Sequence, residues 1–215
     1  MKLRGIIFDL DGVITDTAEY HYKAWKQIAR SINIEIDREF NEKLKGISRV
    51  DSLERILALD TNKIYSSEEK ALLAESKNEI YLKLIQTITP KDILPNILKL
   101  LGDSKKENIK LGVASASKNA ITILDRLEIT NQFDYIVDAS QVTHSKPHPE
   151  IFLKAIEGLK LDEKSCIGIE DAQAGIESIH GCCMKAVAIG DKLVGSELKL
   201  ESTEELSLEI LKTLF

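Results

Sequence analysis

The stretch Ile6–Gly12 (IIFDLDG) near the amino terminus decides the predicted fold. Its first three residues are β-branched or aromatic, which predicts a short buried strand, and the polar residues that follow predict a loop. In open α/β sheets, ligands bind at the carboxyl ends of the strands. Asp9 and Asp11 therefore lie where a ligand is expected, and Gly12 lets the backbone turn away after them.

Four later apolar runs resemble this first strand. Each is short and apolar enough to be buried on both faces, and helix-period segments at 120–127 and 151–159 lie between them, with Pro149 suited to a first helical turn. The alternation of strands and helices predicts an α/β fold with a doubly wound parallel sheet. The four runs are Leu111–Ala114, Tyr135–Val137, Cys166–Ile169 and Ala186–Ile189.

Residues 15–87 contain no convincing strand and are predicted to form an inserted α-helical domain. Apolar residues recur there every four positions, at Ala24, Ile28 and Ile32 and again at Ile80, Leu84 and Ile88. The change of pattern divides the chain into a core, residues 1–14 and 88–215, and a helical cap, residues 15–87.

The composition is that of a folded globular protein. Among 215 residues, 43% are hydrophobic and 30% are charged, and the net charge of −6 argues against a nucleic-acid binder, which needs a basic surface. The three cysteines, Cys166, Cys182 and Cys183, suggest reduced thiols rather than a disulfide framework. No apolar run is long enough to span a membrane or to form a signal peptide, so we expect a cytoplasmic protein.

Polar groups follow three further strands. Ser115–Asn119 precedes a helix, where hydroxyl and backbone N–H groups favour phosphate, Lys146–Pro147 supplies a cation, and Glu170–Asp171 supplies two more carboxylates. Each feature alone also fits a helix cap, a turn or a surface charge. Together they predict phosphoryl transfer with Mg²⁺ between the carboxylates of Asp9 and Asp171. An EF-hand calcium loop is excluded, because its spacing from Asp9 fails at Val13, Ile14 and Tyr20.

These motifs, in this order, resemble the haloacid dehalogenase superfamily of phosphotransferases over nearly the whole chain. The resemblance begins with Phe8–Thr17 (FDLDGVITDT). Within the superfamily, four segments are similar to the β-phosphoglucomutase family: Thr17–His21 (TAEYH), Leu44–Arg49 (LKGISR), Ser115–Asn119 (SASKN) and Gly168–Ile176 (GIEDAQAGI).

The resemblance implies roles for the core residues. Asp9 is expected to be the nucleophile that becomes an aspartyl phosphate, and Asp11 to be the general acid and base. Ser115 and Lys146 are expected to hold the transferring phosphoryl group. The implied Mg²⁺ site consists of Asp9, the backbone carbonyl of Asp11, Glu170 and Asp171. The implied reaction interconverts β-glucose 1-phosphate and glucose 6-phosphate through β-glucose 1,6-bisphosphate.

A mutase also needs a second anion site in the cap, for which Arg49 is the candidate, since a guanidinium can bind phosphate with two hydrogen bonds. By resemblance, His21 is expected to discriminate between sugars and Thr17 to lie at the hinge. The other expected substrate-binding residues are Lys45, Gly46, Ser52, Lys77, Ala116, Ser117, Lys118 and Asn119.

Two alternatives stay open at this stage. The same core could serve an Mg²⁺-dependent sugar-phosphate phosphatase, with water as the final acceptor, or a module that only binds sugar phosphates. We interpret Trp25 as core, and His180, Cys182 and Cys183 as structural rather than zinc-binding. The peptide bond between Lys146 and Pro147 is predicted to be cis. We expect a monomer that binds small sugar phosphates, and neither nucleic acid nor a membrane.

Overall fold

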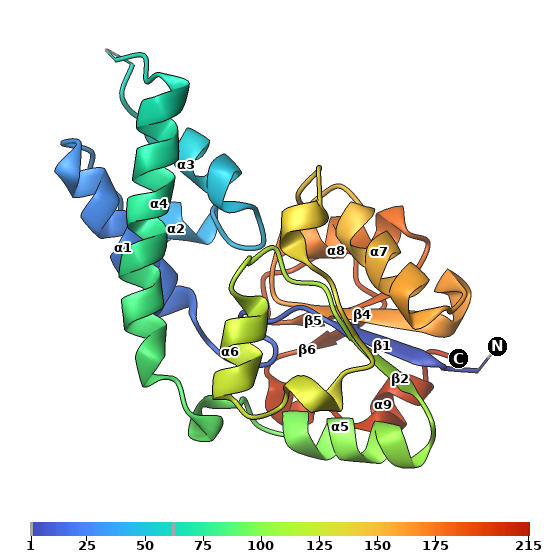
Figure 1. Ribbon diagram of the computed structural model, residues 1–215. Helices are drawn as coiled ribbons and strands as arrows, with labels where there is room; N and C mark the ends of the chain where they lie inside the picture. The colour runs from blue at the N-terminus through green and yellow to red at the C-terminus, as the bar shows by residue number, and fades with distance from the viewer. Residues whose placement is uncertain (1, 62) are drawn as a thin grey trace.

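The computed structural model describes residues 2–61 and 63–215 and has a six-stranded parallel sheet at its centre (Figure 1). The doubly wound parallel sheet predicted from the sequence is thereby confirmed. In spatial order the strands are β3 (Tyr135–Ile136), β2 (Lys110–Val113), β1 (Gly5–Phe8), β4 (Cys166–Glu170), β5 (Lys185–Ile189) and β6 (Leu198–Leu200). In the register of the sheet, Phe8 pairs with Val113 on one side and with Ile169 on the other. The loops that follow β1, β2 and β4 consequently lie side by side at the carboxyl ends of these strands.

Helices cover both faces of the sheet, as Figure 1 shows. These helices are α5 (Ile97–Lys106), α6 (Ala120–Arg126), α7 (Glu150–Leu159), α8 (Gln173–Gly181) and α9 (Leu208–Lys212). One face packs Phe8 and Val113 against α5, α6 and α9, and the other packs Ile7 and Ala186 against α7 and α8.

The segment between β1 and β2 contributes a helical layer beside the sheet, at the left of Figure 1. It has its own apolar core, in which Trp25, Leu53 and Ile56 are buried. Side-chain caps begin two of its helices: the Ser48 hydroxyl accepts the N–H of Asp51, and Ser66 and Glu69 form a capping box. These helices are α1 (Ala18–Ser31), α2 (Arg38–Glu42), α3 (Arg49–Leu57) and α4 (Ser67–Leu84).

The chain leaves and re-enters the core through two adjacent segments. The Leu94 N–H donates to the Ile14 carbonyl at 2.9 Å, and the Thr15 hydroxyl donates to the Asp92 carbonyl at 2.8 Å. The proposed division at 14/15 and 87/88 stays a prediction. Short 3₁₀ helices complete the described elements: Ile85–Thr87, Pro90–Asp92, Thr130–Gln132, Ala139–Gln141, Glu163–Ser165 and Thr203–Glu205.

Three details differ from the sequence predictions. Strand β6 was not predicted, because it has only three residues and Lys199 interrupts its apolar pattern. Strand β3 is not buried on both faces, since it lies at the sheet edge and leaves Tyr135 37% exposed. On α4, Ile80 and Leu84 are only half-buried, whereas Lys77 and Tyr81 are buried.

Among the described residues, no helix combines the length and apolar character needed to cross a bilayer.

Two glycines provide a matched test of how tightly the sheet is packed. A Cβ at Gly168 of β4 would lie 2.5 Å from Cδ1 of the buried Ile179, so Gly168→Ala should destabilise the protein by about 1–3 kcal/mol. A Cβ at Gly102 of α5 would meet no atom within 4 Å, so Gly102→Ala should stabilise by about 0.5–1 kcal/mol. The thermal midpoint should shift by roughly 2–4 °C per kcal/mol, downward in Gly168→Ala and upward in Gly102→Ala. Equal shifts in the two variants would contradict this packing.

Candidate active site

Asp9 lies directly after the central strand β1 and is almost fully buried. Its Oδ1 accepts from Nζ of Lys146 at 2.5 Å, and its Oδ2 accepts the backbone N–H of Asp11 at 3.0 Å. Its own N–H donates to the Ile169 carbonyl at 2.9 Å, which fixes the residue to β4. The carboxylate is therefore held in one position by two strands and one ammonium group.

Lys146 connects Asp9 to a second carboxylate. Its Nζ also donates to Oε1 of Glu170 at 2.6 Å, and both side chains are buried. Burial alone would lower the pKa of Lys146, but the Asp9 and Glu170 carboxylates raise it above its ordinary value, so the ammonium stays charged. The Lys146–Pro147 peptide is cis, as the sequence analysis predicted.

Glu170 is held by the start of the following helix. Its Oε2 accepts the backbone N–H groups of Asp171 at 2.9 Å and of Ala172 at 3.3 Å. A Cβ at Gly175 would lie 1.8 Å from Oε1 of Glu170, so only glycine leaves space for this carboxylate.

Asp9, Glu170 and Asp171 form a cluster that we call the acidic centre. One carboxylate oxygen from each lies within 4.8 Å of the others. Burial, and after it the Asp9 charge, raise the pKa of Glu170 to about 8 and that of Asp171 to about 7. Three carboxylates with this much mutual repulsion are a donor set suited to a hard divalent cation such as Mg²⁺. The Asp11 carboxylate is outside this cluster.

Asp11 instead turns toward the helical layer. Its Oδ1 accepts from the Thr17 hydroxyl, and its Oδ2 lies 3.8 Å from Nε2 of His21. Thr17 is at the N-cap position of α1, but its side chain makes no cap hydrogen bond because it is bonded to Asp11. Burial, and then the Asp9 charge, raise the pKa of Asp11 to about 8, so this carboxyl group holds a proton more tightly than an ordinary aspartate does.

Lys77 and His21 form the wall opposite Asp11. Nζ of Lys77 lies 2.9 Å from Nδ1 of His21 and contacts the rings of Trp25 and Tyr81. Burial and the Arg49 charge lower the pKa of Lys77 to about 7, and burial and Lys77 hold that of His21 well below its ordinary value. Nε2 of His21 is buried without a hydrogen-bond partner among the described residues. When Lys77 donates to Nδ1, the proton of the neutral imidazole is on Nε2.

Asn78 joins the helical layer to the loop after β2. Its Oδ1 accepts from Nη2 of Arg49 at 2.8 Å and from Nδ2 of Asn119 at 2.9 Å. Asn119 is at the N-cap position of α6 but, like Thr17, does not cap the helix with its side chain. The sequence analysis missed Asn78, and its position directly after Lys77 was the one available signal.

The loop after β2 is ordered by its own hydroxyl groups. Oγ of the buried Ser115 accepts the N–H of Ser117 at 3.1 Å, and Oγ of Ser117 accepts the N–H of Asn119 at 3.2 Å. Both hydroxyls keep their hydrogen atoms available as donors to an anion.

Two further contacts join the two layers. Nζ of Lys45 lies 3.8 Å from Oδ2 of Asp171, and the Ser145 hydroxyl donates to Oδ2 of Asp51. Ser145 directly precedes Lys146, so Asp51 contacts the loop that carries the buried ammonium. The sequence analysis named neither Asp51 nor Ser145.

Most of these groups line one cavity of about 470 Å³ between the carboxyl ends of the strands and the helical layer, and Asn78 and Tyr81 lie outside its lining. Of the predicted site residues, Thr17 and Glu170 lie behind its wall. The others line it: Asp9, Asp11, His21, Lys45, Gly46, Arg49, Ser52, Lys77, Ser115, Ala116, Ser117, Lys118, Asn119, Lys146 and Asp171. Trp25, interpreted as core, is buried in the helical layer and also borders the cavity.

Three residues that we interpreted as structural lie away from the cavity. His180 pairs with Glu197 at 3.2 Å, Cys182 is buried, and Cys183 is exposed.

Known proteins are similar to this chain in sequence and in structure. A β-phosphoglucomutase from Bacillus subtilis strain 168 is 48% identical over 212 residues, 97% of this chain and 94% of that protein. The crystal structure of a β-phosphoglucomutase from Clostridium difficile matches with a TM-score of 0.96 and 50% identity, covering 98% of this chain and 96% of that one. A phosphorylated carbohydrates phosphatase from Thermotoga maritima is 26% identical over 178 residues, 82% of this chain and 80% of that protein.

A family model for haloacid dehalogenase-like hydrolases matches residues 6–189, which include β2 to β5 and all of β1 except Gly5. With this match, and with a full-length relative at 48% identity, the chain belongs to the haloacid dehalogenase-like hydrolase family.

Proposed function

We propose that the chain interconverts β-D-glucose 1-phosphate and D-glucose 6-phosphate through β-D-glucose 1,6-bisphosphate and a phosphorylated Asp9. One observation carries the proposal: a single cavity presents Asp9 from the sheet and Arg49 and Lys77 from the helical layer. A substrate with a phosphate at each end needs both walls, because one phosphate reacts while the other must be neutralised elsewhere. The similarity to β-phosphoglucomutases over almost the whole chain supports the same activity.

In the proposed reaction, a phosphoryl group moves twice. Phosphorylated Asp9 gives its phosphoryl group to the 6-hydroxyl of β-glucose 1-phosphate, and Asp11 accepts the hydroxyl proton. The bisphosphate then reorients in the cavity. Asp9 attacks the phosphorus at position 1, the bond from phosphorus to the sugar oxygen breaks, and Asp11 protonates that oxygen to release glucose 6-phosphate. The raised pKa of Asp11, about 8, supports the acid role in this step.

Lys146 and Ser115 provide the fixed charge and hydrogen bonds for the phosphoryl oxygens. Because both are buried and already oriented, they need little reorganisation as charge develops. Phosphotransferases of this family are generally metal-dependent, and we propose Mg²⁺ held by Asp9, Glu170, Asp171 and the backbone carbonyl of Asp11. When bound, the cation would offset the negative charge shared by the carboxylates and the phosphoryl group.

The helical layer is proposed to bind the rest of the substrate. Arg49 binds the distal phosphate with Ser117 and Asn119, while the unpartnered Nε2–H of His21 donates to a sugar hydroxyl. Thr17 orients Asp11 near the hinge. The remaining proposed contacts are Lys45, Gly46, Ser52, Lys77, Ala116 and Lys118.

Residues 15–87 act in this proposal as a cap over the core formed by residues 1–14 and 88–215. The closed cap excludes water from phosphorylated Asp9, which favours a mutase over a phosphatase. We also propose that the protein acts as a monomer in the cytoplasm on small sugar phosphates.

The decisive experiment follows glucose 6-phosphate and inorganic phosphate together, with Mg²⁺, β-glucose 1-phosphate and a trace of β-glucose 1,6-bisphosphate. We expect glucose 6-phosphate with little phosphate release, and no product from Asp9→Asn, because an amide is not nucleophilic enough to take the phosphoryl group. Phosphate release equal to substrate loss would instead identify a sugar-phosphate phosphatase.

Asn78→Ala tests the second anion site. The change leaves Nη2 of Arg49 and Nδ2 of Asn119 without their shared acceptor, so kcat/KM for the mutase reaction should fall roughly 10- to 100-fold. Glu79→Ala, at an exposed position of the same helix, is the control and should change kcat/KM little. An equal loss in both variants would mean that Asn78 only supports the helix.

The acidic centre predicts a pH-dependent response to Mg²⁺. Without a divalent cation, the folded chain keeps a proton on Asp171 that the unfolded chain releases. The stability from this group is therefore present below its ordinary pKa and is lost as the pH rises through about 7. Since Mg²⁺ binds the deprotonated carboxylates, it should raise the thermal midpoint more at about pH 8.5 than at about pH 5.5. Asp171→Asn should reduce this difference, and an equal Mg²⁺ effect at both pH values would contradict the assignment.

A further inference from the structure

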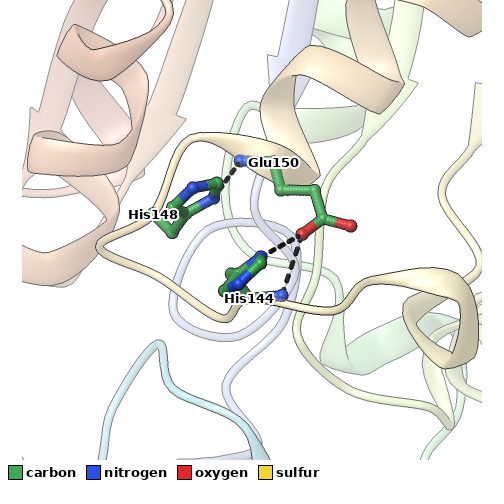
Figure 2. A group of neighbouring side chains, drawn as sticks. All are labelled: His144, His148 and Glu150. Atoms are coloured by element: carbon green, nitrogen blue, oxygen red, sulfur yellow. Dashed lines mark hydrogen bonds and ion pairs between the residues drawn. The ribbon is translucent and has the colours of Figure 1, made fainter.

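A second group of possible metal ligands lies outside the cavity, in the loop that enters α7. Figure 2 shows the imidazoles of His144 and His148 and the carboxylate of Glu150 gathered on one side of this loop. One ligand atom from each residue lies within 4.8 Å of the other two. The chain has four histidines. His21 borders the cavity, and His180 pairs with Glu197. His144 and His148 are the neighbouring pair to which the proposed function gives no role.

Glu150 organises the loop around this group. Its carboxylate accepts the backbone N–H of Thr143 at 2.9 Å and that of His144 at 2.8 Å. Its own backbone N–H donates to Nδ1 of His148 at 3.2 Å. Both ends of the loop are thereby fixed to a single residue, and the two imidazoles are brought to a centroid distance of 4.6 Å with 34° between their planes.

The distance between the His144 and Glu150 ligand atoms is close to that in a tetrahedral metal site. Two ligand atoms at about 2.1 Å from a zinc ion are roughly 3.4 Å apart, and Nδ1 of His144 lies 3.1 Å from Oε2 of Glu150. A ligand nitrogen of His148 lies within 4.8 Å of these two atoms, and a rotation of the His148 side chain is needed to bring it to the same separation. Both histidines are exposed, so this rotation meets little packing, and water can complete the coordination.

We propose that His144, His148 and Glu150 bind a transition-metal dication of the Zn²⁺ class. Two imidazoles and a carboxylate are a donor set for zinc, whereas Mg²⁺ prefers oxygen ligands and suits the acidic centre. Binding through Nδ1 of His144 replaces its hydrogen bond to Oε2 of Glu150 and leaves the imidazole proton on Nε2.

The position of the site gives it a structural consequence. Lys146 lies between the two histidines in sequence, and its Nζ is fixed to Asp9 and Glu170. A cation held by His144 on one side of Lys146 and by His148 and Glu150 on the other cross-links the loop that presents this ammonium. The bound metal is therefore expected to stabilise the loop from the surface while the acidic centre holds it from inside.

The first test is a Zn²⁺ titration of the full chain in excess Mg²⁺, with a chromogenic chelator as competitor. We expect saturable Zn²⁺ binding that weakens at least about tenfold in His144→Gln and in His148→Gln, because each removes one ligand. His180→Gln is the matched control, since His180 also pairs with a glutamate but has no second imidazole beside it, and it should bind as the unmodified chain does.

Imidazole ¹⁵N spectra of the unmodified chain provide a second readout that needs no variant. Zn²⁺ should shift the signals of His144 and His148 and leave those of His21 and His180 in place. The proposal is overturned if Zn²⁺ shifts neither His144 nor His148, or if binding survives both histidine variants and is lost in Asp171→Asn, which would place the ion at the acidic centre.

Discussion

The buried ammonium of Lys146 lies between carboxylates from two neighbouring strands, and the rest of the active site depends on this arrangement. A buried charge without a partner is strongly destabilising, so Asp9, Lys146 and Glu170 require one another. The glycine at 175 leaves room for Glu170, and the N–H groups that begin the loop before α8 hold its second oxygen. This network fixes the Asp9 carboxylate at the cavity with hydrogen bonds to both of its oxygens.

A second constraint operates between the sheet and the helical layer. Thr17 and Asn119 are both at N-cap positions, yet their side chains bond to Asp11 and to Asn78 and not to their own helices. Each helix thereby forgoes a stabilising cap, and the polar group serves the cavity instead. Lys77 also serves the cavity at a cost in stability, because it occupies a buried position of α4 that an apolar residue would fill more favourably.

Local sequence was sufficient to predict those strands that are directly followed by a polar loop. The run before Asp9, the residues around Ser115 and the Glu170–Asp171 pair identified the strands and their loops, because β-branched runs followed by turn residues have few other structures. The same reasoning failed for β6, whose short segment forms a strand only because β5 provides its partner. It also failed for Asn78, because an asparagine in the middle of a helix carries no local sign of what it will contact.

The sequence by itself determined the class of fold, the family and the carboxylates at the strand ends, since these follow from periodicity and from short motifs. Only the tertiary structure decided which charges meet. It placed Lys146 against Asp9, 137 positions away in the sequence, and Asn78 against Asn119, 41 positions away. It also placed Asp51 of the helical layer against Ser145 of the loop before α7. It also turned the Asp11 carboxylate away from the acidic centre and toward Thr17 and His21. Such pairings depend on how the layers pack, and burial, which decides the pKa of each group, exists only once the layers are in place.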